Sequence, residues 1–218
     1  MHNKPKKVLK ILFGILVITA VLGLTLGFSK KYLLAEFMTN EESEEPVIIT
    51  EINNEEEYLA FAHSVNKDNV YTGQVVNLHA DLDFSDYENV PVIGVIEGES
   101  SVAEFNGVFD GNGHKISGIQ IARNDSISAM FGKLTGVIKN LKIEDCSFSG
   151  NVCGAIAADN SSGAVLNCYV DAEVSGEVKG TAVGRNYSSV LNCMTSAEAC
   201  GENYGKMRDC YLIGKQNI

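Results

Sequence analysis

Val165-Leu166-Asn167-Cys168-Tyr169-Val170 decides the fold, because this phrase recurs along the chain. Its other copies occupy residues 137–141, 190–195 and 207–212. Each copy has Asn or Asp at one position, and successive copies of that position lie 27, 25 and 17 residues apart: Asn140, Asn167, Asn192 and Asp209. Recurrence at about 20–50 residues indicates a solenoid, whose units are too small to bury an apolar face alone and therefore stack.

The composition of the repeat predicts strands. Val, Ile, Tyr and Cys form runs too short for helices, and Gly, Asn and Ser between them mark turns. We interpret residues 165–170 as one strand, and the small-residue segments 154–158 and 180–184 as strands that face a narrow interior. The sequence therefore predicts an all-β protein, a single coil of strands wound into a β-helix.

Stacked coils place equivalent side chains above one another at the strand spacing, about 4.8 Å. Besides the column of Asn140, Asn167, Asn192 and Asp209, two more are expected: Asn160, Asn186 and Asn203 at a turn, and Cys168, Cys193 and Cys210 inside. Amide ladders satisfy one another's hydrogen bonds and tolerate the left-handed backbone of sharp corners. Cys is small and apolar enough for the interior.

The N-terminus predicts a membrane anchor. Residues 11–28 are uncharged and apolar, four lysines precede them, and only Lys30 and Lys31 follow closely. This pattern predicts a cytoplasmic basic tail (1–10), an uncleaved transmembrane signal-anchor helix (11–31) and an extracellular remainder, in a single-pass cell-membrane protein. The rival is a cleaved signal peptide, but its apolar core is usually about 7–15 residues, and residues 27–29 make a poor cleavage site.

Residues 32–46 predict an acidic linker, and residues 47–218 the extracellular domain. From residue 29 onward the chain has 13 Lys and Arg against 28 Asp and Glu. This balance argues against nucleic acid as a partner and suits a soluble surface domain.

The sequence of the first part of the domain predicts one helix and several strands. An amphipathic helix is expected over residues 55–66, capped by Asn53 or Asn54, and it is a candidate cap for one end of the solenoid core. Strands are expected over 47–50, 74–82 and 92–94, and a loop over 97–104. Residues 110–113, Asp110-Gly111-Asn112-Gly113, are a double turn signal between strand residues.

A resemblance rests on several segments: residues 80–85, 105–119, 129–132, 138–141, 167–169 and 209–211. On these segments, residues 48–215 resemble the bacterial surface proteins with GLUG-type repeats. The resemblance implies a right-handed parallel β-helix with an N-terminal capping helix, similar in architecture to pectate lyases. It implies no single activity, since such repeats occur in adhesins, in other surface proteins and beside immunoglobulin-A metallopeptidases.

Few residues are candidates for metal binding or catalysis. Asp81, Asp83 and Asp86, with Glu88 nearby, offer oxygen ligands for calcium, but the spacing is not that of an EF-hand and favours solvent-facing or turn-capping carboxylates. His114 is expected to pack on the turn at 110–113, and a catalytic base is the alternative. We assign no catalytic residue and expect no cofactor.

All six cysteines lie in residues 146–210. Local bridges within Cys146–Cys153 and Cys193–Cys200 are open alternatives, and mostly free core thiols are favoured. No Cys-x-x-Cys pair supports a thiolate metal site.

The expected function is non-catalytic: adhesion, binding of a surface glycan or protein ligand, or structural display through the sides of the solenoid. The alternative is a carbohydrate-active enzyme, a polysaccharide lyase or glycoside hydrolase. An open final coil exposes unpaired backbone, so we expect one of three outcomes: end-to-end self-association with another copy, residues 214–218 folded over the opening, or a chain shortened relative to similar proteins.

Overall fold

The computed structural model describes residues 48–67, 71–94 and 103–214. Our predictions of a basic tail, a membrane helix and a linker lie outside these residues. Within them, we find no helix with the length and apolar character needed to cross a membrane. Residues 46–218 make one compact unit.

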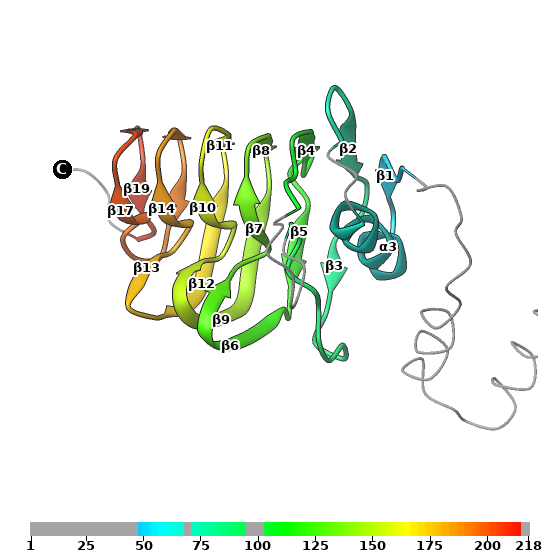
Figure 1. Cartoon of the computed structure of the whole chain (residues 1–218), viewed down its shortest axis with the longest axis horizontal. Coiled ribbons are helices and arrows are strands. Elements are labelled where there is room, and N and C mark those ends of the chain that lie inside the picture. Colours follow the sequence, from blue (N-terminus) through cyan, green and yellow to red (C-terminus); the bar gives the residue numbers. More distant parts are fainter. Residues whose placement is uncertain (1–47, 68–70, 95–102, 215–218) are drawn as a thin grey trace, which may run out of the picture. The chain divides into compact units, whose positions relative to one another are not determined.

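The strands form three parallel sheets, and the chain passes from one sheet to the next to make each coil (Figure 1). The first sheet has β1 (Glu51–Ile52), β2 (Val75–Leu78), β4 (Val108–Asp110), β8 (Val137–Lys139), β11 (Ala164–Leu166), β15 (Ser189–Leu191) and β18 (Lys206–Arg208). The second has β7 (Phe131–Leu134), β10 (Ala157–Asn160), β14 (Val183–Asn186) and β17 (Cys200–Asn203). The third has β3 (Leu82–Asp83), β5 (Lys115–Ser117), β9 (Lys142–Gly154), β12 (Tyr169–Ser175), β16 (Met194–Thr195) and β19 (Tyr211–Leu212). Two more strands, β6 (Gln120–Ser128) and β13 (Val178–Gly180), pair with β9.

This architecture is a parallel β-solenoid, as the repeat predicts. Equivalent residues of successive coils pair in register, so Ile138, Val165 and Val190 lie above one another, and all three are fully buried. A core column of this kind exists only when coils stack, which is why the apolar positions of the repeat recur.

Residues 165–170 are not one strand, contrary to our prediction. Asn167 has φ of 55° and separates β11 from β12, and Asn140, Asn192 and Asp209 make the same corner with φ of 53–55°. Asn and Asp enter this left-handed region far more readily than the β-branched residues around them.

The small-residue segments 154–158 and 180–184 are not single strands either, because each contains a corner between the end of one strand and the start of the next. β9 ends at Gly154 and β10 begins at Ala157, while β13 ends at Gly180 and β14 begins at Val183. A Cβ built on Gly154 would lie 2.3 Å from the Ala157 carbonyl oxygen, so the backbone itself fills the space at this corner.

The predicted helix is present as α3 (Glu55–Asn66), and Asn54 caps it by accepting a hydrogen bond from Glu57 N at 2.9 Å. Its apolar face enters the core, where the Phe61 ring meets the Phe105 ring edge-on at 5.5 Å. α3 lies beside β1, β2 and β3, at the N-terminal end of the described stack (Figure 1). The helix therefore covers core side chains that no earlier coil covers in the described part of the chain.

The remaining predictions for this region need correction. Residues 48–50 are irregular, and the strand is the next segment, β1. Residues 74–82 contain β2 and the start of β3 with a turn between them, because each short coil must change direction between sheets. Within 92–94 only Ile93 pairs, through an isolated bridge to Phe131. Of the predicted loop at 97–104, Ala103 and Glu104 are irregular, and the rest lies outside the described residues.

Candidate functional site

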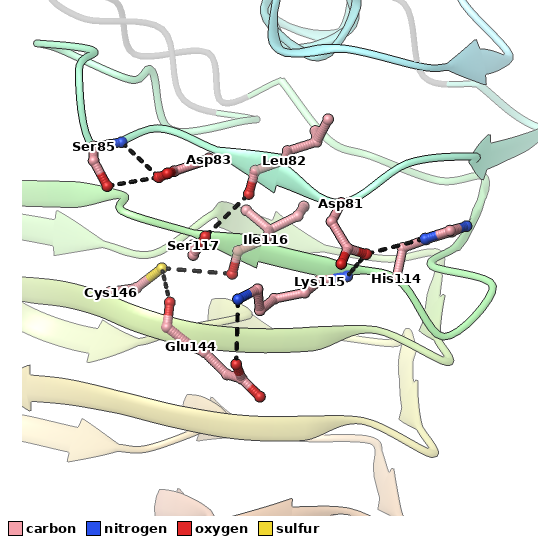
Figure 2. A network of polar contacts seen from close by, with 10 residues as sticks. All are labelled: Asp81, Leu82, Asp83, Ser85, His114, Lys115, Ile116, Ser117, Glu144 and Cys146. Atoms are coloured by element: carbon pink, nitrogen blue, oxygen red, sulfur yellow. Dashed lines mark hydrogen bonds and ion pairs between the residues drawn. The ribbon is translucent and has the colours of Figure 1, made fainter.

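Of the sequence-predicted acidic residues, Asp81 lies just before β3 and joins this coil to the next (Figure 2). Asp81 Oδ1 accepts a hydrogen bond from Lys115 N at 3.0 Å and lies 3.1 Å from His114 Nδ1. The Lys115 ammonium is 3.6 Å from Glu144 Oε2 in the next coil. These contacts attach the segment before β3 to β5, and β5 to β9.

Asp83 is satisfied locally. Its Oδ1 accepts hydrogen bonds from Ser85 N at 3.0 Å and from Ser85 Oγ at 2.6 Å (Figure 2). Asp86 is exposed, and no group of three or more His, Cys, Asp or Glu among the described residues is arranged to hold a metal ion. The structure does not bring Asp81, Asp83 and Asp86 together as a calcium-binding set.

The lowered pKa values of Asp81 and Asp83 fit a structural role. The hydrogen bond from the Lys115 backbone, followed by that from His114, lowers the pKa of Asp81, and the Ser85 hydroxyl lowers the pKa of Asp83. A carboxyl with a lowered pKa is ionised at neutral pH and has no proton to donate as a general acid.

Asp110 anchors the predicted turn at residues 110–113. Its Oδ1 accepts from Asn112 N at 3.0 Å and from Asn140 Nδ2 at 2.9 Å, while Lys139 Nζ lies 2.9 Å from Oδ2. Asn112 and Gly113 adopt φ of 50° and 80°, which the turn requires. Asp110 is therefore the acceptor at the start of the corner column.

The corner column is a hydrogen-bonded ladder. Asn167 Nδ2 donates to Asn140 Oδ1 at 3.3 Å, and Asn192 Nδ2 donates to Asn167 Oδ1 at 2.8 Å. Each asparagine Nδ2 in this ladder donates to the equivalent residue of the preceding coil. Asp209 continues the corner, but its carboxylate cannot donate to the Asn192 oxygen.

The second column runs in the opposite direction and ends β10, β14 and β17. Asn160 Nδ2 donates to Asn186 Oδ1 at 2.8 Å, and Asn186 Nδ2 donates to Asn203 Oδ1 at 2.7 Å. The Asn160 and Asn186 side chains are fully buried, whereas Asn203 is exposed. Asn160 Oδ1 finds no hydrogen-bond partner among the described residues, and Asn160 pairs with Leu134 of the previous coil.

The structure has a second surface that the sequence did not predict. We name it the tyrosine patch, and it consists of Asp159, Arg185, Glu202, Tyr187 and Tyr204. The rings of Tyr187 and Tyr204 stack with centroids 5.1 Å apart and an interplanar angle of 12°. The two residues are nevertheless 51% and 65% exposed. The signal in the sequence was the pair of phrases Arg185-Asn186-Tyr187 and Glu202-Asn203-Tyr204, of which only the asparagines were interpreted.

The charged side of the tyrosine patch is a row across three paired strands. Asp159 pairs with Arg185 and Arg185 with Glu202 in the β-sheet register. Arg185 Nε lies 3.3 Å from Glu202 Oε2, and Arg185 Nη1 lies 3.8 Å from Asp159 Oδ1. The guanidinium group therefore separates two carboxylates.

Asp159 in this row differs from Asp81 and Asp83 in the direction of its pKa shift. Burial, reinforced by the charge of Glu202, raises the pKa of Asp159 even though Arg185 opposes the shift. The charge of Glu202 also raises the pKa of Tyr204. The Cα atoms of Asp159 and Glu202 lie two coils apart, roughly 10 Å at the usual strand spacing.

All six cysteines are free thiols in the structure, and neither of the two local bridges is formed. Cys168 and Cys193 are buried and Cys210 is half-buried. Each thiol donates to the carbonyl oxygen two residues earlier, at 3.3 to 3.4 Å: Leu166, Leu191 and Arg208.

No protein-family model matches the chain, and no curated protein matches it. The resemblance to GLUG-type repeat proteins therefore stays a prediction. One similar solved structure is the crystal structure of a "putative immunoglobulin A1 protease from Bacteroides ovatus", with 20% sequence identity and a TM-score of 0.61. The match covers 75% of this chain and 56% of that one. At this identity the likeness shows the β-solenoid fold alone.

Proposed function

We propose that the chain is a non-catalytic binding module, anchored in the cell membrane through residues 11–31 and displayed outside it. The tyrosine patch is its binding surface, and its ligand is a neutral glycan. The observation that carries the proposal is a pair of stacked, half-exposed tyrosine rings beside an Arg–carboxylate row.

The rings supply contact area at low entropic cost. A tyrosine side chain has two χ angles, and the partner ring already restricts them in each member of the pair. Exposed aromatic rings with a polar tip are typical of binding surfaces, because one part is apolar and the other forms hydrogen bonds.

The charged row selects the ligand. Arg185 offers N–H donors, whereas Asp159 and Glu202 offer acceptors, an alternation that suits a polyhydroxylated ligand. A polyanion is disfavoured, because the whole chain has a net charge of −11.

Membrane display rests on the sequence: the apolar run at residues 11–28, the lysines before it and the acidic remainder of the chain. A protease-fusion assay tests it, with a reporter at either terminus in intact cells. The proposal expects the C-terminal reporter to be degraded by external protease and the N-terminal one to be protected.

A binding screen against immobilised neutral and acidic glycans tests the ligand. Tyr204→Ala should weaken binding to the best glycan about tenfold, which corresponds to about 1.4 kcal/mol for one lost ring contact. Tyr211→Ala is the matched control, because Tyr211 is exposed on β19 and lies outside the tyrosine patch. Equal losses for the two variants, or a wild-type chain that prefers acidic glycans, would contradict the proposal.

A carbohydrate-active enzyme is the second candidate, and the raised pKa of Asp159 favours it. A raised pKa favours the protonated carboxyl that a general acid needs, and Glu202, two coils away, would be the second carboxylate of an inverting glycosidase. Release of reducing ends from a bound glycan, abolished by Asp159→Asn, would establish it. Binding without turnover supports the non-catalytic module.

A further inference from the structure

We propose that the cysteine file, Cys168, Cys193 and Cys210, is a covalent modification site. A small-molecule disulfide such as oxidised glutathione converts Cys193 and Cys210 into one intramolecular disulfide and leaves Cys168 reduced. This inference is independent of the proposed ligand.

The register of the third sheet places these thiols in line. Tyr169 pairs with Met194, and Met194 pairs with Tyr211, so the cysteine before each of these residues lies one coil from the next. At the usual strand spacing their Cα atoms are about 4.8 Å apart, within the 4.4–6.8 Å that a disulfide spans.

The side chains of the file lean in one direction, and Cys168 and Cys210 both affect the pKa of Cys193. Cys193 Sγ also lies 3.8 Å from the Val165 carbonyl oxygen, and Cys210 Sγ lies 3.6 Å from that of Val190, so each side chain leans toward the preceding coil. This shared direction points Cys210 at Cys193.

Exposure decides which pair reacts. Cys168 and Cys193 are buried, and a dissolved disulfide reaches neither directly. Cys210 is half-buried, and its hydrogen bond to the Arg208 carbonyl oxygen is exposed. Cys210 is therefore the residue that meets the oxidant.

Two exchange steps complete the reaction. The Cys210 thiolate attacks one sulfur of the small disulfide, so a mixed disulfide forms and one small thiolate leaves. The Cys193 thiolate then attacks the Cys210 sulfur, the intramolecular bond forms and the second small thiolate leaves. Two protein thiols lose two electrons and two protons, and one small disulfide becomes two small thiols.

The reaction is slow at neutral pH. Contact with the Cys168 thiol is the main reason that the pKa of Cys193 rises to about 12, and contact with Cys193, followed by burial, raises that of Cys210. Because only the thiolate attacks, the rate should rise about tenfold for each pH unit from 8 to 10. The product joins β16 to β19.

Peptide mapping tests the site in the full-length chain. After incubation with oxidised glutathione at pH 9, free thiols are alkylated, and tryptic peptides are analysed by mass spectrometry without reduction. The expected product links the peptide at residues 186–206 to the one at 209–215, and fragmentation locates the bond at Cys193. Cys168 is expected to be alkylated.

Cys200 provides the matched control, because it lies in the same peptide as Cys193, is buried and is outside the file. Cys193→Ala should lose the linked peptide, whereas Cys200→Ala should keep it. The proposal is overturned if fragmentation places the bond at Cys200, if only the mixed disulfide with glutathione accumulates, or if all three thiols of the file stay reduced.

Discussion

Asn167 offers a quantitative test of the corner ladder. Its side chain donates to Asn140 Oδ1 and accepts from Asn192 Nδ2, and its backbone has φ of 55°. Asn167→Ala removes both hydrogen bonds and leaves a residue that resists the left-handed conformation. Because the side chain is exposed, each hydrogen bond contributes about 0.5 kcal/mol. The strain adds about 1 kcal/mol, so the expected loss of unfolding free energy is about 2 kcal/mol.

Asn167→Gly separates the two contributions. Glycine also lacks the ladder hydrogen bonds, but it enters the left-handed region without strain. We therefore expect Asn167→Gly to be about 1 kcal/mol more stable than Asn167→Ala. Glu173→Ala, at an exposed position on β12, is the control and should change stability by under about 0.5 kcal/mol.

Urea titration of the purified chain, followed by circular dichroism, measures these differences. The reasoning fails if Asn167→Ala is as stable as the wild type. It also fails if the glycine and alanine variants lose the same amount, because the corner would then impose no left-handed conformation.

Three further predictions follow from the ladders and can be checked by urea titration. Asn186→Ala should destabilise the chain by about 2–4 kcal/mol, more than the same change at exposed Asn167, because it leaves the buried amide of Asn160 without its main acceptor; a smaller loss than at Asn167 would contradict this. Asp209→Asn should stabilise by about 0.5–1 kcal/mol, because an amide at this corner can donate to Asn192 Oδ1, and an unchanged midpoint would show that the ladder ends before this coil. Burial raises the pKa of Asp110, but the hydrogen bonds from Asn140, Lys139 and the Asn112 backbone outweigh it and lower the pKa overall. The stability from its ionised form is therefore present above the unfolded-state pKa of about 3.9 and lost as pH falls through the lower folded-state value. The stability difference between wild type and Asp110→Asn should shrink below about pH 4, and a constant difference from pH 7 to 2 would rule out this linkage.

The sequence predicted the solenoid because stacking makes the core positions recur. The column of Asn140, Asn167 and Asn192 was visible for the same reason, since one corner repeats in every coil. The position of that corner was not visible. Val, Leu, Cys and Tyr on both sides of Asn167 are good strand residues, so the segment reads as a single strand, and only the left-handed φ of Asn167 shows the break.

The tyrosine patch was harder to predict. The predicted column of Asn186 and Asn203 implies that the residues before them, Arg185 and Glu202, also pair, but their 17-residue separation is shorter than the 25 to 27 residues between the earlier copies of the repeat. Their contact depends on strand register, which local residue preferences do not determine. The acidic residues show the reverse case. Asp81 and Asp83 are close in sequence, but they have different hydrogen-bond partners: Asp81 accepts from Lys115 N, and Asp83 accepts from Ser85 Oγ.

Coaxial stacking in register is tested most directly by interstrand nuclear Overhauser effects in the isotopically labelled chain. The account predicts backbone proton contacts that link Tyr169 to Met194 and Met194 to Tyr211, in the parallel pattern. Contacts in an antiparallel pattern, or strong contacts that link Tyr169 directly to Tyr211, would contradict it.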